Sequence, residues 1–210
     1  ALFHDRGSSN QPFFCNAARD IFRAVLVHFI RQAKADPDQW RPRLNNADLL
    51  KALQSFQTQH YIQIFNHYAD MRSLVSYLGD GKSNQALGVF GELNSMLSEY
   101  FVGILAAHAP DRSISMRNAV RRKGGRAIFV EYDLAVGETL TPIYRLLVDQ
   151  ALKEALSRTE KSGNVYFIAD EFKLLPKLRH IDDALNFGRG LGVRVMAGIQ
   201  SIDQLYDVYG

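Results

Sequence analysis

The stretch NVYFIADEF (Asn164–Phe172) is a short apolar run that ends in two adjacent carboxylates, Asp170 and Glu171. Its valine, tyrosine, phenylalanine and isoleucine follow one another without polar alternation, which is typical of a parallel strand buried on both faces. Residues at the carboxyl end of such a strand lie at the crevice where open α/β sheets bind ligands. Two carboxylates in that place are costly to bury unless a cation or a reaction uses them.

These nine residues leave two interpretations of the acidic pair open. In the first, the pair is a Walker-B-type site, in which Asp170 holds Mg²⁺ through its water shell and Glu171 orients the water that attacks a γ-phosphate. In the second, Asp170 and Glu171 are a solvated strand end or cap a helix, because acidic side chains are favoured in first turns. The choice depends on the rest of the chain.

The composition is that of a soluble globular protein. The 210 residues are 47% hydrophobic and 22% charged, enough for one large domain or two small ones. A formal net charge of +3 is compatible with an acidic partner. The single cysteine, Cys15, excludes an internal disulfide and a cysteine-rich metal site. No run approaches the ~18 apolar residues of a membrane span, and the histidines, which lack metal-ligand spacing, are expected to be structural.

Residues 13–110 are predicted to form an all-helical unit. A first helix should run from Phe14 to about Ala35, because apolar residues recur there at helical spacing. Asn46 is predicted to cap the next helix, and Ser83 a later, longer one. The apolar stripe expected on that longer helix consists of Leu87, Phe90, Leu97, Phe101, Ile104 and His108.

Strands and helices alternate after Gly124. The pattern predicts strands at 127–133, 164–170 and 193–199, and helices from Thr141-Pro142, at 178–190 and after residue 200. Such alternation gives crossover connections and a parallel sheet. We therefore assign residues 1–123 to an all-α domain, entered at about residue 13, and residues 124–210 to part of an α/β nucleotide-binding domain.

Gln200 and Ser201 directly follow the third predicted strand, so they should reach the same edge of the sheet as the acidic pair. A glutamine both donates and accepts hydrogen bonds, which suits it to sense a γ-phosphate or to position the attacking water. The alternative is a glutamine that caps the next helix. We favour the sensor role and include Ser201 with Asp170 among the nucleotide-binding residues.

Arg189 lies between two glycines in FGRGLG, at the end of a predicted helix. It could act on a neighbouring subunit's nucleotide as an arginine finger. It could equally complement the carboxyl end of its own helix, where a cation is favoured.

A basic run precedes the first predicted strand. Its members could bind nucleic acid phosphates in a salt-dependent way, or could form a solvated helix face and loop, which we place slightly ahead. The candidates for nucleic-acid binding are Arg117, Arg121, Arg122 and Lys123.

The segment GDGKS (79–83) is only superficially a phosphate-binding loop. The pattern G-x-x-x-x-G-K-[ST] needs glycine at position 76, which is Ser76. The segment also follows a predicted helix, whereas a phosphate-binding nest needs strand, loop and helix in that order. We therefore expect a turn between helices, and we expect this chain alone not to bind ATP tightly.

The segments FIADEF, FGRGLGVRVMAGIQS and QLYDVYG together resemble the C-terminal nucleotide-domain signature of conjugative coupling proteins, the TraG/TraD-like family of type IV secretion. The segment QPFFCNAARDIFRAVL also resembles the one with which that family enters its all-α domain. The resemblance spans nearly the whole chain in order, although residues 45–110 match in pattern more than in motif.

The resemblance implies the cytoplasmic part of a bacterial inner-membrane protein, a RecA-like hexameric ATPase with an all-α insertion. Such a protein recruits a relaxase–DNA complex or secreted proteins and passes them to the secretion channel, using ATP and Mg²⁺. On this pattern Asp170 and Glu171 match the Walker B acids, and Gln200 matches the residue after the following strand. Arg189 falls where family members carry a basic residue.

The sequence departs from the family pattern because it has neither the phosphate-binding loop nor a transmembrane anchor. We therefore expect a soluble piece of a longer protein, inactive as an ATPase by itself. Two alternatives remain open. The helical half could be a module that recognises substrates or DNA, or the chain could belong to another RecA-like hexameric motor.

Overall fold

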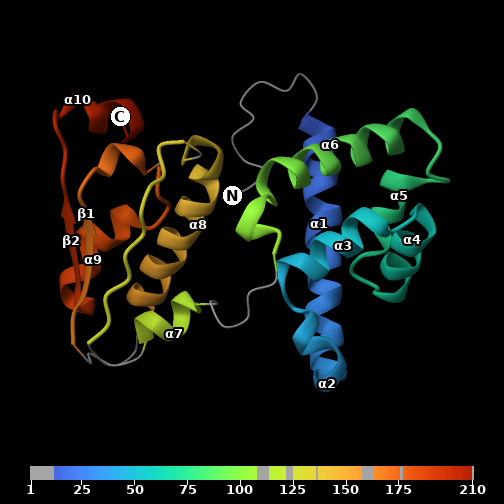
Figure 1. Ribbon diagram of the computed structural model, residues 1–210, viewed down its shortest axis with the longest axis horizontal. Coiled ribbons are helices and arrows are strands. Elements are labelled where there is room, and N and C mark those ends of the chain that lie inside the picture. Colours follow the sequence, from blue (N-terminus) through green and yellow to red (C-terminus); the bar gives the residue numbers. More distant parts are fainter. Residues whose placement is uncertain are drawn as a thin grey trace. The chain divides into compact units, whose positions relative to one another are not determined.

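The computed structural model describes residues 12–107, 114–121, 125–135, 137–157, 163–175 and 177–209. These residues form two compact units, 12–107 and 114–209 (Figure 1). Within the described part of the chain, no helix is long and apolar enough to cross a membrane.

The first unit is all helical over residues 12–107, as the sequence predicted. Its central helix α1 packs against α2, α3, α4 and α6. The α-helices are α1 (Pro12–Ala35), α2 (Pro37–Trp40), α3 (Asn46–Ser55), α4 (Thr58–His67), α5 (Val75–Leu78) and α6 (Asn84–Tyr100). The 3₁₀ turns are η1 (Arg41–Arg43), η2 (Arg72–Leu74) and η3 (Gly103–Leu105).

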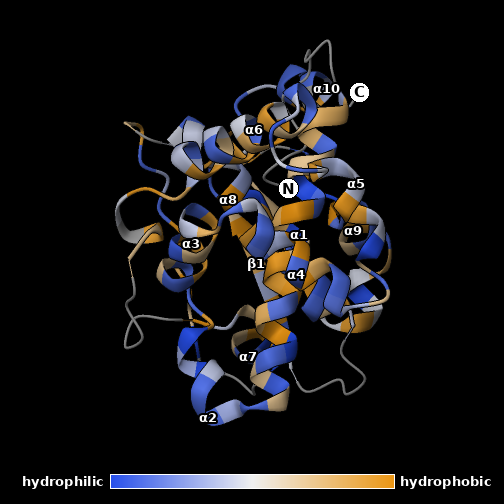
Figure 2. Cartoon of the chain, turned by 90° about the vertical axis from the view of Figure 1, so that its right-hand side faces the viewer, coloured by the Kyte–Doolittle hydropathy of each residue, from blue (hydrophilic) through white to orange (hydrophobic). Residues whose placement is uncertain are grey.

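The core of this unit is built on one stripe of α1. Ile21, Val25 and Phe29 are buried, as their helical spacing predicted, and small alanines between them let neighbouring helices approach closely. Figure 2 shows hydrophobic and hydrophilic residues alternating around the turns of α1. The unit thus buries one stripe of its central helix with its own side chains.

The predicted cap of α3 and the predicted apolar stripe of α6 need correction. Ser83 caps α6 as predicted, with its hydroxyl accepting from the Ala86 N–H at 3.1 Å. The cap of α3 is Asn45 rather than Asn46, because the Asn45 side chain accepts from the backbone N–H of Asp48. Leu87, predicted to be in the buried stripe, is 58% exposed, because the stripe of α6 that faces the core begins with the small Ala86. α6 ends at Tyr100, so the predicted Ile104 lies beyond it in η3, and the predicted His108 lies outside the described residues.

The second unit is a parallel two-stranded sheet with helices. Strands β1 and β2 pair in register from Val165↔Val193 to Ala169↔Ala197, and α9 connects them. The elements are α7 (Met116–Arg121), α8 (Gly137–Leu156), β1 (Val165–Ala169), η5 (Phe172–Leu174), α9 (Ile181–Leu191), β2 (Val193–Ala197) and α10 (Asp203–Tyr209). Gly192 ends α9 in the left-handed conformation, as expected for a glycine cap.

The strand predicted at 127–133 is wrong. Residues 125–133 have no regular secondary structure, and Ile128, Phe129 and Val130 are exposed. A strand needs a neighbour to bond to, and in the described part of the chain β1 and β2 pair only with each other. The apolar composition of this segment therefore favours a strand, but no described strand pairs with it.

The sheet is also buried on one face only, which corrects the expectation drawn from NVYFIADEF. Residues Val165, Phe167 and Ala169 face the core with α8 and α9, whereas Tyr166 and Ile168 are more than half exposed. Met196, opposite Ile168 on β2, is exposed in the same way.

Helix α7 packs against α8 in the second unit, although the predicted division at 123/124 placed it with the first. Its Arg121 forms an ion pair with the buried Glu154 of α8. The assignment of residues 1–123 and 124–210 to two functional domains stays a prediction.

Candidate functional site

The acidic pair and Gln200 lie at the carboxyl ends of the two strands. Asp170 and Glu171 directly follow β1, and Gln200 lies three residues beyond the end of β2. The parallel register brings these ends together, and Gln200 Nε2 donates a hydrogen bond to Glu171 Oε2 at 3.0 Å. The structure thus joins Glu171 and Gln200, two of the four residues that the sequence predicted at this edge.

Among the described residues, the Glu171 carboxylate has a hydrogen-bond partner for one of its two oxygens. Its Oε1 is buried and has no hydrogen-bond partner among the described residues. A buried carboxylate oxygen without a partner costs at least about 1–3 kcal/mol. Such an atom is suited to accept from a water molecule that a bound substrate would hold in place.

Asp170 is exposed, and its carboxylate makes no hydrogen bond or ion pair with any described residue. Oxygen ligands of this kind suit Mg²⁺, which commonly binds proteins through one or two carboxylates and keeps several waters. The residues present therefore fit the predicted contact to Mg²⁺ through water, because the Asp170 carboxylate is available and Glu171 stands beside it.

Ser201 and Gln204 secure the chain after Gln200. The Ser201 hydroxyl accepts from the Asp203 N–H at 3.1 Å and donates to the Asp203 carboxylate, so it caps α10. Gln204 Oε1 accepts from the backbone N–H of Gln200 at 3.2 Å. Capping is therefore done by Ser201, while the side chain of Gln200 points to Glu171. A contact of Ser201 with nucleotide stays a prediction.

Gly198 was missed by the sequence reasoning. A Cβ atom there would overlap the carbonyl oxygen of Asp170, so the end of β2 comes against the acidic pair only because this residue has no side chain. The signal in the sequence is the glycine of MAGIQS, two positions before Gln200.

Arg189 lies far from this edge within its own chain. It is exposed in the last turn of α9, next to Val193 at the amino end of β2. An extended chain from Val193 to Gln200 spans roughly 20 Å. Arg189 therefore lies at the opposite end of β2 from the acidic pair, and its role as an arginine finger stays a prediction.

A comparison with known families decides the class of the chain. The family model described as the type IV secretion-system coupling protein DNA-binding domain matches residues 1–210. The chain belongs to this coupling protein family.

Individual relatives agree with this family. Conjugal transfer protein TraG of Agrobacterium fabrum is 31% identical over 88 residues, which are 41% of this chain and 13% of that protein. The solved structure of the bacterial conjugative coupling protein TrwBdeltaN70 with sulphate is 23% identical, with a TM-score of 0.68 over 100% of this chain. TrwB in complex with the non-hydrolysable GTP analogue GDPNP, and with ADP and Mg²⁺, gives the same identity and TM-score.

The chain spans 47% of the solved TrwBdeltaN70 chain and 46% of the one with ADP and Mg²⁺. The likeness shows the fold, which is an all-α domain followed by part of a RecA-like parallel sheet.

The basic run of this coupling protein chain is partly engaged in ion pairs. Arg121 Nε lies 2.6 Å from the Glu154 carboxylate and Arg117 Nε lies 3.8 Å from it. Gln150 donates to the other oxygen of the same carboxylate. Both arginines remain at least partly exposed, so nucleic-acid binding by them stays a prediction. Arg122 and Lys123 lie outside the described residues.

The GDGKS segment is a turn between α5 and α6, as predicted. Gly79 ends α5 with a positive φ of 53°, and Ser83 begins the next helix. It follows a helix and carries no nest of amides after a strand, so it does not have the architecture of a phosphate-binding loop.

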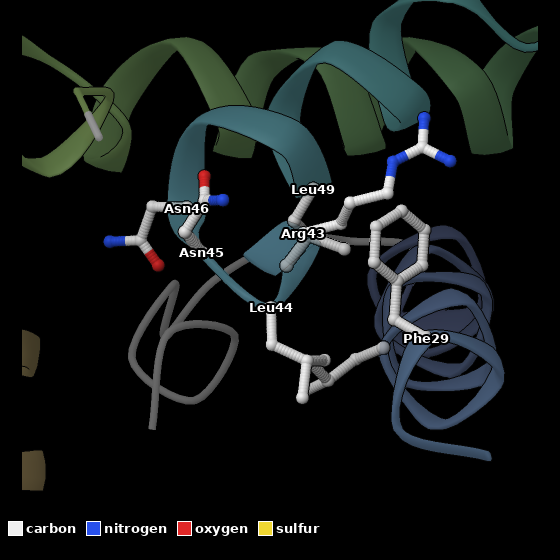
Figure 3. Close-up of a pocket in the computed structure, with 7 residues that line it drawn as sticks. Phe29, Arg43, Leu44, Asn45, Asn46 and Leu49 are labelled. Carbon is white, nitrogen blue, oxygen red and sulfur yellow. The ribbon is translucent and has the colours of Figure 1, made fainter. Parts of the chain in front are cut away.

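The helical unit has one further feature of interest, a groove of about 200 Å³ between α1 and the η1–α3 connection (Figure 3). Its floor is formed by the buried Phe29 and Leu49, and its rim by the exposed Leu26 and Leu44. At one end, the Arg43 guanidinium lies over the Trp40 ring at 5.0 Å. The groove is therefore apolar inside and basic at its margin.

Proposed function

We propose that this chain is part of the motor of a conjugative coupling protein, and that the intact protein hydrolyses ATP to drive the transfer of its substrate. The observation that supports this most directly is the hydrogen bond from Gln200 to Glu171 at the carboxyl edge of the parallel sheet. A glutamate held by a glutamine from the next strand is suited to position a water molecule against a phosphoryl group.

The two residues have different tasks in this proposal. Gln200 donates to Oε2 of Glu171 and fixes the direction of the carboxylate. This leaves Oε1, which has no partner among the described residues, to accept a hydrogen bond from the attacking water.

Asp170 would hold Mg²⁺ through water, and the ion would neutralise charge on the phosphate oxygens. The phosphate-binding loop would come from a part of the protein outside these 210 residues. This fits the solved TrwB structures, one of which holds ADP and Mg²⁺ and covers more than twice the length of this chain.

We further propose that the intact protein works as a hexamer anchored in the bacterial inner membrane. Arg189 would then reach the nucleotide of the neighbouring subunit, since its own site lies at the other end of β2. The substrate would be a relaxase–DNA complex or a secreted protein that is passed to channel components. The family description as a DNA-binding domain supports contact with DNA.

The test is ATP hydrolysis by the intact protein with Glu171→Gln. The variant keeps the size and the hydrogen bond to Gln200 but loses the charge, so we expect turnover to be abolished while nucleotide still binds. The matched control is Glu131→Gln, the same change in an exposed segment of the same unit. Turnover at the wild-type rate in Glu171→Gln would contradict the proposal.

A second function is favoured by the groove of the helical unit, namely recognition of a protein substrate. An aliphatic side chain of the substrate would enter between Leu26 and Leu44, and an acidic neighbour would pair with Arg43. Leu44→Asp should then weaken binding of the relaxase to the chain. The control is Leu87→Asp, at a leucine that is also exposed but lies on α6 outside the groove. If both variants bind the relaxase equally well, the groove is not the recognition site.

A further inference from the structure

Gly198 bonds to the backbone on both sides of the acidic pair. Its N–H donates to the carbonyl oxygen of Ala169 at 2.7 Å, and its carbonyl oxygen accepts from the N–H of Phe172 at 2.9 Å. In a regular parallel ladder, one residue bonds to two residues that are two positions apart on the neighbouring strand. Here they are three positions apart, so Asp170 and Glu171 together oppose Gly198. This is a β-bulge, and the extra residue belongs to the acidic pair.

The bulge changes which side chains face the core. The inward residues of β1 alternate and end at Ala169, so a regular strand would turn Glu171 inward and Phe172 outward. Instead, Phe172 is only 6% exposed and stacks on Tyr209 with ring centroids 5.6 Å apart. The extra residue lets Phe172 fill the core and lets Glu171 turn along the edge of the sheet to Gln200.

Only glycine leaves enough space at position 198. A Cβ atom would overlap the Asp170 carbonyl oxygen, which is a backbone atom of the bulge and cannot turn away as a side chain could. Gly198 is not among the glycines with positive φ, so the requirement is for space and not for an unusual backbone conformation. Any side chain at this position must push β2 away from the acidic pair.

We propose that Gly198 is a positioning residue for Glu171. It closes the bulge that aims the Glu171 carboxylate, and it sets the distance from which Gln200 reaches that carboxylate. This inference rests on the proposed hydrolytic function. Gly198 itself touches no reacting atom in this proposal, because it acts through Glu171 and Gln200.

The first experiment is Gly198→Ala in the intact protein, with ATP turnover measured against ATP concentration. We expect kcat to fall about 100-fold, as for a displacement of about 1 Å at a reacting group, with little change in KM. The matched control is Gly188→Ala, where the new Cβ would lie 3.1 Å from the Cβ of Val193 at the other end of β2. That variant also strains the packing of β2, but it should keep kcat.

A second comparison tests the route of the effect. If Gly198 acts through the pair, Gly198→Ala should cause almost no further loss of kcat in a protein that already carries Gln200→Ala. A wild-type kcat in Gly198→Ala overturns the proposal. A full additional loss on top of Gln200→Ala also overturns it, because Gly198 would then act by another path.

Failure of this inference can be told apart from failure of the proposed function. Wild-type turnover in Glu171→Gln removes the hydrolytic role, whatever Gly198→Ala does. Loss of turnover in Glu171→Gln with normal turnover in Gly198→Ala removes only the positioning role.

If Gly198→Ala does not fold, amide hydrogen exchange of the wild-type chain tests the proposal instead. The amides of Gly198 and Phe172 both donate to backbone oxygens in the bulge and should exchange more slowly than in an unstructured chain. Unprotected exchange at both amides shows that the bulge is not closed in solution and overturns the proposal.

Discussion

The two units of this chain enclose their apolar residues to different degrees. In the helical unit, helices on several sides surround α1, and Ile21 and Val25 are completely buried. In the α/β unit, helices cover one face of the sheet, and the other face exposes Tyr166, Ile168 and Met196. A helix can be enclosed by neighbours of one small unit, whereas a parallel sheet needs cover on both faces.

This difference separates what the chain supplies by itself from what it leaves open. The helical unit provides its own core, so its stability should depend on residues within 12–107. The α/β unit positions Glu171 and Gln200 with its own strands but leaves an apolar face uncovered by any described residue. Substitutions that act on one unit and spare the other can therefore test the comparison directly.

Phe65→Ala is expected to have the largest effect on the free energy of unfolding. Phe65 is 0% exposed in the helical core, so its loss should cost about 3–5 kcal/mol. The matched change in the other unit, Ile168→Ala, removes a side chain that is 65% exposed and should change stability by no more than about 0.5 kcal/mol.

Urea denaturation can assign each effect to its unit. The single tryptophan, Trp40, packs on Phe29 in the helical unit, so its fluorescence reports unfolding of that unit. Circular dichroism reports both units. Phe65→Ala should shift the fluorescence transition strongly, and Ile168→Ala should not. Equal losses from the two substitutions would show that the exposed face is covered in solution.

The next effect belongs to the α/β unit alone. Arg121→Ala leaves the buried Glu154 carboxylate without its 2.6 Å partner, which should destabilise this unit by about 2 kcal/mol. Arg117→Ala removes a longer contact from a side chain that is 63% exposed, and should cost less than about 1 kcal/mol. The Trp40 transition should not move in either variant. Unchanged stability with weakened DNA binding would instead support the nucleic-acid role.

The candidate site was predictable from sequence to the extent that it depends on strand ends. Because carboxyl ends of parallel strands meet at one edge, the end of the apolar run before Asp170 and the position of Gln200 were enough to predict that they lie together. Gly198 could not be predicted, because its role depends on a bulge that shifts the backbone pairing by one residue. The local amino-acid composition does not indicate that shift in the pairing.

The fold was predictable where local signals and packing agree. The first helix and the Ser83 cap are set by local periodicity and a side-chain hydrogen bond, and both were found. The strand at 127–133 was predicted but does not form, because a strand also needs a partner strand from elsewhere in the protein. The exposed Leu87 shows the same limit on α6, since the packed stripe uses the smaller Ala86 that a search for large apolar residues passes over.

A smaller effect compares the same substitution in both units. Ser83 caps α6 and Ser115 accepts a hydrogen bond from the N–H of Asn118 at the start of α7. Each serine-to-alanine change should cost about 1 kcal/mol, because one amide at a helix start loses its partner. Ser83→Ala should shift the Trp40 fluorescence transition of the helical unit. Ser115→Ala should shift only the unfolding transition of the α/β unit, seen by circular dichroism. A shift of both transitions by either change would show that the two units unfold together.

The smallest effect is a pH dependence confined to the helical unit. His28 lies among Phe29, Trp40 and Tyr68, and burial together with the nearby His67 lowers the pKa of His28 from its ordinary value of 6.5. The folded unit therefore binds this proton less readily than the unfolded chain. The contribution of neutral His28 is complete above pH 6.5 and is lost as the pH falls through the lower pKa of the folded state.

This prediction is checked by Trp40 fluorescence in urea from about pH 8 to about pH 5. The fluorescence transition should move to lower urea as the pH falls below 6.5. His28→Gln should reduce that pH dependence, because its amide can still contact the Tyr68 hydroxyl, which lies 3.0 Å from His28 Nδ1, but does not titrate. An unchanged pH dependence in His28→Gln would assign the proton to another group and would contradict the prediction.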